Sequence, residues 1–503
     1  MKVATEEVPI QPVIQVMKPT QPASTSTWKD APFAILFLLH VAAIVAVMVS
    51  LGVPMLNAAA SSSQAGSTGS SPSFTPQDIG TIAVVAVVLA VVSAIVAYLL
   101  LQAVLKFAKQ IIAYSLWGNV VMCFVFAAAG FAGGAAVLAI VFIFFGMCGL
   151  CYVHAVKSRI PFAGANLHVA AAAVTKNWSI FPVAILVMAI KVVWVFLWAV
   201  AFIGVLGNVT TESPNPGASS AGTSCSANSE CESGACDISR NSDSQKICQP
   251  FVPGQVVVAY CFMLLSLYWG VNVAKYVLHT TVAGMVATWL AAGDSQSAMS
   301  GSFRRASTTS FGSICLGAFL VAILQTLEAL AKEAKKKGNG AACIAECILL
   351  ILRGVLMYIN RWAFVYVGMY GFPFAHAGKA VFGLFQQRGL SAIVNDDLVD
   401  TAMGALSLVS GVICALLALA YSLVGMTSTF SGANIIVPLV GFVFGAGVTL
   451  IPLSVVNSAV ATVFVFFAED PAALSRTHPD LHNDLISAWR TAHPDAMAAF
   501  VAM

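Results

Sequence analysis

The sequence predicts an all-α fold, that of a polytopic integral membrane protein with about ten transmembrane helices. Of its 503 residues, 59% are hydrophobic and only 9% are charged, whereas an average soluble protein is about 25% charged. Because a soluble fold needs a polar surface, this composition argues against a soluble enzyme and against a disordered chain. The hydrophobic runs are about 20 residues long and lack period-2 alternation, which favours helices over the strands of a membrane barrel.

The elements follow in order along the chain. Residues 1–30 are polar and rich in Pro, Thr and Ser, so we expect a disordered cytosolic tail. Five helices are then expected within residues 31–206 and five more within 253–467, before a cytosolic tail at 468–503. The ten apolar segments are Phe33–Val53, Ile79–Leu105, Ile111–Phe131, Ala135–Val153, Phe181–Leu206, Gly254–Ala274, Ser313–Leu330, Ile344–Tyr370, Ala402–Val424 and Ile435–Phe467.

The last segment is about 50 Å long as a helix, which exceeds the ~30 Å hydrocarbon core. It contains Pro438 and Pro452, so we expect a kink, a break or a cytosolic extension there. If both termini are cytosolic, most Lys and Arg fall on the inner side, as the positive-inside rule requires. Lys332–Lys337 is the local exception. We therefore expect cytosolic termini. The expected location is the plasma membrane, with lysosome and endosome as the alternatives. The small net charge of +3 predicts no nucleic-acid partner.

Residues 207–252 form a polar, Cys-rich loop that this topology places outside the cell. Four closely spaced cysteines in such a loop predict two disulfides in an oxidising compartment, with three connectivities open. They are Cys225, Cys231, Cys236 and Cys248. A zinc site is the alternative, but the loop has no His, and no metal is expected. Asn208 opens an Asn-x-Thr sequon, which predicts glycosylation.

Charged residues inside apolar spans are the sharper signal, because each is costly in lipid. Lys191 lies in the middle of its span, and Glu346 and Arg353 lie seven residues apart on one helix face. They predict an ion-paired pathway or a proton-coupling group, in which His279 is a further candidate. The alternative is a structural pair between helices. Motifs for a nucleophile–base pair, a metal or a cofactor are absent from the sequence, so we expect no catalytic residues and no cofactor.

Aromatic residues mark two spans. Tyr268 and Trp269 lie on the sixth, and four aromatics recur every four residues along the eighth. The four are Tyr358, Trp362, Tyr366 and Tyr370. A stripe of this kind can line a path for an organic cation through cation–π attraction, and the alternative is ordinary packing or an interfacial belt.

Several segments resemble the choline transporter-like family, and most closely its fungal pH-nine-sensitive branch. The matching segments are Ser158–Ala163, Tyr268–Trp289, Ser310–Cys315, Asn360–Gly371, Ala468–Pro471 and His478–Leu481. The family commonly has Tyr where this chain has Phe364, and Lys where it has Phe372. The resemblance implies the ten-span layout and transport of a small solute.

We therefore expect a transporter of choline or a related organic cation, working by facilitated or proton-linked alternating access. The six aromatic residues are the candidate substrate contacts, and membrane lipids are the expected surroundings. The alternative is a non-transporting scaffold or receptor that binds an extracellular partner through the Cys-rich loop 207–252.

Overall fold

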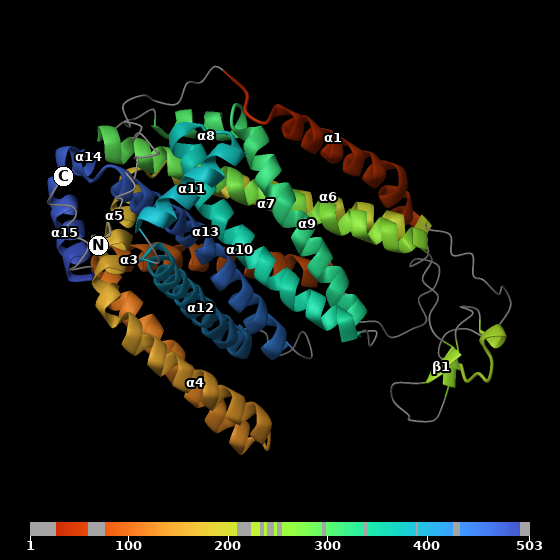
Figure 1. Cartoon of the computed structure of the whole chain (residues 1–503). Coiled ribbons are helices and arrows are strands. Elements are labelled where there is room, and N and C mark those ends of the chain that lie inside the picture. The colour runs from red at the N-terminus through yellow and green to blue at the C-terminus, as the bar shows by residue number, and fades with distance from the viewer. Residues whose placement is uncertain are drawn as a thin grey trace, which may run out of the picture.

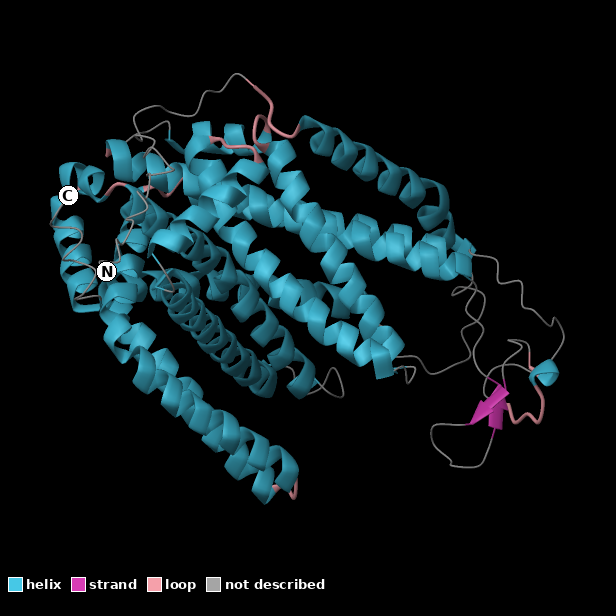
Figure 2. Cartoon of the chain, in the orientation of Figure 1, coloured by secondary structure: helices cyan, strands magenta, loops and turns pink. Residues whose placement is uncertain are grey.

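The computed structural model of the chain is helical throughout its membrane part (Figures 1 and 2). It describes residues 27–58, 76–208, 223–231, 236–238, 246–248, 254–293, 298–336, 340–388, 391–425 and 433–492. Among these residues, nine helical segments are long and apolar enough to cross a membrane. The predicted all-α polytopic membrane fold is confirmed. The expected tail at 1–30 lies almost entirely outside the described residues.

The bounds of the elements are as follows. The first half of the chain contains α1 (Ala31–Val47) with a π-helical turn η1 (Met48–Gly52), α3 (Pro76–Ala132), α4 (Ala136–Val156), a 3₁₀ turn η2 (Lys157–Arg159), α5 (Ile160–Lys176) and α6 (Ile180–Asn208). The outer loop contains η3 (Asn228–Glu230), β1 (Cys236–Ile238) and β2 (Lys246–Cys248). The second half contains α7 (Gly254–Ala292), α8 (Ala298–Ser307), α9 (Phe311–Lys336), α10 (Gly340–Tyr370), α11 (Phe374–Arg388), α12 (Ser391–Gly425), α13 (Ala433–Glu469), α14 (Pro471–Thr477) and α15 (Pro479–Ala492).

The difference between ten predicted spans and nine helical segments arises in α3. The predicted spans 79–105 and 111–131 both lie in this one element, and they meet at Phe107, whose backbone is not helical (φ −128°, ψ 27°). The predicted spans leave residues 106–110 between them, and the chain bends there at a single residue. α4 then packs along α3.

The inner connection between α4 and α6 forms a helix that the sequence reasoning did not expect. Pro161 lies in the first turn of α5, where its missing N–H costs no hydrogen bond. Most of the small residues of α5 are buried against α3 and α13. The chain end packs on this helix as well, since Trp489 of α15 meets Phe162 edge-on at 4.9 Å between ring centroids. Residues 471–492 are therefore helical and attached to the bundle.

α12 and α13 form the most extensive helix pair of the bundle. A Cβ atom at Gly445 would lie 2.6 Å from the Cβ of Cys414, so only a glycine permits this approach. Across the contact, the Ser410 and Thr449 hydroxyls lie 2.6 Å apart. Close approach and polar contacts between helices replace the hydrophobic driving force that lipid does not supply. α13 stays one helix through Pro438 and Pro452, without a break.

The start of α1 is tied to the second half of the chain by one carboxylate. Asp30 accepts hydrogen bonds from the Ser313 hydroxyl (2.6 Å) and from the backbone N–H of Phe374 (2.9 Å). We call Asp30, Ser313 and Phe374 the N-terminal anchor. Gly312 lies beneath it, and a Cβ there would be 2.3 Å from the Asp30 carbonyl oxygen. The anchor fixes α1 to the starts of α9 and α11.

Candidate functional site

A cavity of about 640 Å³ opens between α6, α7, α10, α12 and α13. Much of its wall is apolar. Its polar and charged side chains are Lys191, Lys275, Tyr276, His279, Tyr358, Arg361, Asp400, Ser454, Asn457 and Ser458. Cavities with an apolar wall and a few convergent polar groups are the usual form of small-molecule sites.

Two of the charged side chains of this cavity, those of Lys191 and Lys275, lie far from the nearest ends of their helices. Lys191 is about 17 Å from the start of α6, and Lys275 is about 26 Å from the end of α7, at 1.5 Å per residue. Both helices are candidate membrane spans. Charges at such depth are costly in lipid and are kept for a pathway or a binding site.

Three of the cavity's polar groups form a closed network between α10, α12 and α13. Arg361 pairs with Asp400 (Nη1 to Oδ2, 2.9 Å) and donates to the side-chain oxygen of Asn457 (2.6 Å). The amide nitrogen of Asn457 donates to the other Asp400 oxygen at 2.5 Å. Both carboxylate oxygens of Asp400 are therefore engaged, and three helices are held at one point.

His279 extends this junction to α7. Its Nε2 lies 2.8 Å from the carbonyl oxygen of Arg361, and its Nδ1 lies 2.8 Å from the Ser458 hydroxyl. A carbonyl oxygen only accepts, so Nε2 carries the hydrogen, and in the neutral ring Nδ1 accepts from Ser458. His279 is 7% exposed. A group that bridges three helices at the cavity wall would respond to any rearrangement of those helices.

The predicted aromatic residues are not brought together. Of the six predicted aromatic residues, only Tyr358 lines the cavity. Trp362 is buried against Phe464, with ring centroids 5.4 Å apart. The hydroxyl of Tyr370 donates to Glu469 at 2.5 Å, and Tyr366 packs beside Tyr370 at the end of α10.

The aromatic pair on α7 faces a different neighbourhood. The indole N–H of Trp269 donates to the backbone oxygen of Cys315 at 3.0 Å, and its ring meets Phe37 edge-on. Tyr268 is half-buried and packs against the same hydrophobic core. Neither borders the cavity. The four-residue repeat on α10 spirals gradually around the helix, because 3.6 residues make one turn.

The predicted intramembrane charges divide into two groups. Lys191 and His279 line the cavity. Arg353 instead pairs with Glu328 of α9 (2.9 Å), which also binds Lys332 (2.6 Å). Glu346 pairs with Lys335 at 3.0 Å. Glu346 and Arg353 therefore tie α9 to α10 through partners that the sequence did not identify.

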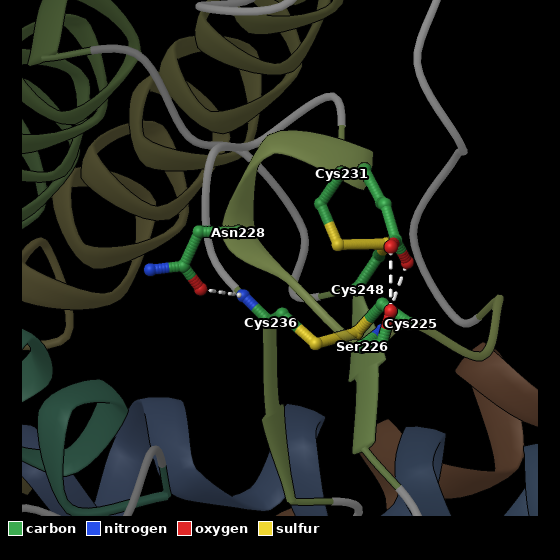
Figure 3. The surroundings of a disulfide bond; sticks show 7 residues. Cys225, Ser226, Asn228, Cys231, Cys236 and Cys248 are labelled. Carbon is green, nitrogen blue, oxygen red and sulfur yellow. Dashed lines mark hydrogen bonds between the residues drawn. A yellow bond between two sulfur atoms is a disulfide. The ribbon is translucent and has the colours of Figure 1, made fainter.

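The Cys-rich loop forms a small unit with two disulfides (Figure 3). Cys225 pairs with Cys236, and Cys231 pairs with Cys248, which selects one of the three open connectivities. β1 and β2 pair antiparallel beside them. The unit lies beyond the end of the bundle that is opposite to α14 and α15 (Figure 1).

Two side chains of this unit accept hydrogen bonds from its backbone. Asn228 accepts a hydrogen bond from the backbone N–H of Cys236 (2.8 Å; Figure 3). Glu230 accepts hydrogen bonds from the hydroxyl and the backbone N–H of Ser226. The hydroxyl bond, followed by the backbone bond, holds the pKa of Glu230 below its usual range. Asn208 is the last residue of α6, and the rest of its sequon lies outside the described residues.

Sequence reasoning missed six polar residues of the cavity, Lys275, Tyr276, Asp400, Ser454, Asn457 and Ser458. It ended the sixth span at Ala274 and began the ninth at Ala402, which left Lys275 and Asp400 in loops. The available signal was the apolar run that continues after Lys275 to Leu290. Arg361 was not selected as a site residue either, although it lies in the three-helix junction.

These helices define a multi-pass membrane protein with a polar cavity between its helices. The family model described as "Plasma-membrane choline transporter" matches residues 140–472. The match covers more than half of the chain, which therefore belongs to the choline transporter-like family, a family of transporters.

Curated relatives agree with this assignment. A CTL-like protein of Dictyostelium discoideum is 28% identical over 385 residues, which cover 75% of this chain and 61% of the relative. Protein PNS1 of Gibberella zeae is 26% identical over 363 residues, covering 70% and 62% respectively. Protein PNS1 of Saccharomyces cerevisiae is 25% identical over 503 residues, covering 94% and 85%. The chain spans about three fifths of the length of the first two relatives, and the fungal names support the pH-nine-sensitive branch.

Proposed function

We propose that this protein transports choline or a related organic cation, and that the solute crosses the membrane through the cavity. The observation that carries the proposal is the cavity itself, with polar groups deep inside the bundle of a chain that belongs to a transporter family. The matching family is described as a plasma-membrane choline transporter, so choline is the first solute to test. We propose no enzymatic activity.

The cavity offers contacts suited to an organic ammonium group. Tyr358 lines the cavity, and aromatic faces attract quaternary ammonium groups. Asp400 adds a carboxylate on the opposite helix. An inside-negative membrane potential favours entry of a cation by ~2.3 kcal/mol per charge per 100 mV. Facilitated transport would therefore concentrate the solute without a coupled ion.

Alternating access requires a contact that breaks when the helices rearrange. The junction of His279, Arg361, Asp400 and Asn457 joins α7, α10, α12 and α13 at the cavity wall. We propose that this junction opens and closes during the cycle. In a proton-linked cycle His279 is the better placed of the two candidate groups, because Glu346 is paired with Lys335 outside the cavity.

We further propose the plasma membrane as the location, with both termini in the cytosol. The support is the distribution of Lys and Arg and the two disulfides of the Cys-rich loop, which need an oxidising space. In this orientation the Glu328, Lys332 and Arg353 cluster faces the outer side.

A second candidate function is recognition of an extracellular partner by the Cys-rich loop. The observation that favours it is the compact two-disulfide unit, which has its own strand pair and side-chain caps. Deleting residues 223–248 separates the two roles. Retained transport would assign the loop to another task, and lost transport in a folded protein would make the loop part of the transporter.

The test of the main proposal is uptake of labelled choline into proteoliposomes that contain the purified full-length protein. Uptake above empty vesicles, increased by an inside-negative potential, is the expected result. The absence of such uptake with folded protein would overturn choline as the solute.

A further inference from the structure

The charge balance of the cavity is unusual for a site that would take a bare cation. Among its described lining residues, Lys191, Lys275 and Arg361 are cationic and Asp400 alone is acidic. The cations therefore form one cluster around the space that a solute would occupy.

The single carboxylate is already engaged. One oxygen of Asp400 pairs with Arg361, and the other accepts from Asn457. Of the charged residues that the structure describes, none forms an ion pair with Lys191 or Lys275. Lys275 instead lies over the ring of Tyr276, with 5.4 Å from Nζ to the ring centroid. Two ammonium groups thus face the cavity without a protein anion.

Two ammonium groups without an ion-pair partner in the cavity wall would be stabilised by an anion that binds between them. A bare organic cation would meet the repulsion of the whole cluster. An oxyanion between Lys191 and Lys275 would remove that repulsion and receive charge-assisted hydrogen bonds. The same cavity has an aromatic and apolar wall, with Tyr358, Met188 and Met357, which suits an organic body.

We propose that Lys191 and Lys275 form an anion subsite in this cavity, which takes a phosphate or carboxylate group carried by the organic solute. This inference rests on the proposed function for its transport step, and it narrows the solute class to organic ammonium compounds that also bear an anionic group. The anionic group contacts the two lysines, and the ammonium end lies toward Tyr358.

Phosphate groups reach a membrane cavity from two sources, a soluble solute and a lipid headgroup. Both present the same oxyanion chemistry to the lysines. The soluble source is tested with phosphocholine and with glycine betaine, which carries a carboxylate. The lipid source is tested with short-chain phosphatidylcholine, which adds acyl chains to the same headgroup.

The experiment measures ligand binding to the purified full-length protein through the ligand-dependent shift of its thermal unfolding. Phosphocholine or glycine betaine is expected to bind at least tenfold more tightly than choline. The double variant Lys191→Gln with Lys275→Gln is expected to lose at least tenfold in affinity for the anionic compound and none for choline. The double variant Lys191→Arg with Lys275→Arg keeps both positive charges and is expected to retain binding of the anionic compound. It therefore tests the subsite independently if the Gln variant folds poorly.

The matched control is Lys176→Gln, which alters an exposed lysine at the end of α5. It is expected to leave all affinities unchanged. Competition by short-chain phosphatidylcholine with phosphocholine would assign the subsite to a lipid headgroup, and its absence would assign it to the soluble compound.

Two results distinguish failure of this inference from failure of the proposed function. Choline uptake and binding that exceed those of both anionic compounds, unchanged in the Lys→Gln double variant, would overturn the anion subsite and leave the transporter intact. No uptake of any of the three soluble compounds would overturn the proposed transport. Tight, lysine-dependent binding of phosphocholine in that case would still support the subsite.

Discussion

The contact between Arg361 and Asp400 provides a quantitative test of the cavity's architecture. The perturbation is the pair of substitutions Arg361→Gln and Asp400→Asn, made singly and together. The Asp400→Asn change keeps the shape of the side chain but removes its charge. Arg361 is then left beside the cationic cluster, with Asn457 as its remaining side-chain partner in the junction.

The expected magnitude follows from the exposure of the two side chains. Breaking a fully buried ion pair costs about 3–5 kcal/mol, whereas an exposed pair contributes about 0.2–1 kcal/mol. The Arg361 side chain is 17% exposed and that of Asp400 is 47% exposed, so the pair lies between these limits. We expect Asp400→Asn to lower the free energy of unfolding by about 1–3 kcal/mol, with a coupling energy of about 1–2 kcal/mol in the double variant.

The assay is a double-mutant cycle on the free energy of unfolding, measured by denaturant titration of the purified protein in detergent. The control pair is Lys336→Gln with Glu333→Gln, whose side chains are 75% and 49% exposed. Its coupling energy is expected to stay below about 0.5 kcal/mol. Additivity of Arg361→Gln and Asp400→Asn within about 0.5 kcal/mol would refute the junction as a structural contact.

Three further predictions address other parts of the molecule. Gly312→Ala should destabilise the protein by about 1–3 kcal/mol, because its Cβ would lie 2.3 Å from the backbone oxygen of Asp30 in the N-terminal anchor. The control is Gly378→Ala, where a Cβ would meet nothing within 4 Å. Equal melting temperatures of the two variants would contradict the anchor. Cys231→Ser should lower the stability of the Cys-rich loop by about 3 kcal/mol; limited proteolysis should then cleave the loop first, and an unchanged cleavage pattern would count against the pairing. If transport is proton-linked, His279→Gln should flatten the pH dependence of uptake, whereas Glu346→Gln should leave it unchanged. The reason is that His279 borders the cavity and Glu346 does not. The reverse outcome would assign proton coupling to the α9–α10 contact.

The membrane fold was accessible from sequence because it depends on composition and run length. Apolar runs of about 20 residues and the scarcity of charge are averages over many residues, so single errors do not matter. The bend at Phe107 lies in the gap that the sequence places between two spans, where Lys106, Lys109 and Gln110 interrupt the apolar run. The sequence does not show that the helix resumes after a single residue. α5 was missed because it lies in an inner connection between two spans, although its run of alanines was an available signal for a helix.

The candidate site was accessible only in part. Lys191 and His279 attract notice as polar residues inside apolar spans, and both line the cavity. Lys275 and Asp400 lie where the apolar signal weakens, so a boundary error of one or two residues removes them from the membrane. Glu346 and Arg353 share a helix face as expected, yet their partners come from α9, and partners on another helix cannot be read from one chain's spacing.

Gly354 offers the most direct test of transport through the cavity. It lines the cavity, and a Cβ at this position would meet nothing within 4 Å, so a large side chain can enter the open space. Gly404 has equally open surroundings on α12 and does not border the cavity, which makes it the matched control.

The decisive measurement is uptake of labelled choline and labelled phosphocholine into proteoliposomes containing wild type, Gly354→Trp or Gly404→Trp protein. We expect uptake of at least one solute above empty vesicles in wild type and Gly404→Trp, and none in Gly354→Trp. Equal uptake by all three proteins, or no uptake of either solute by folded wild type, would contradict transport through this cavity.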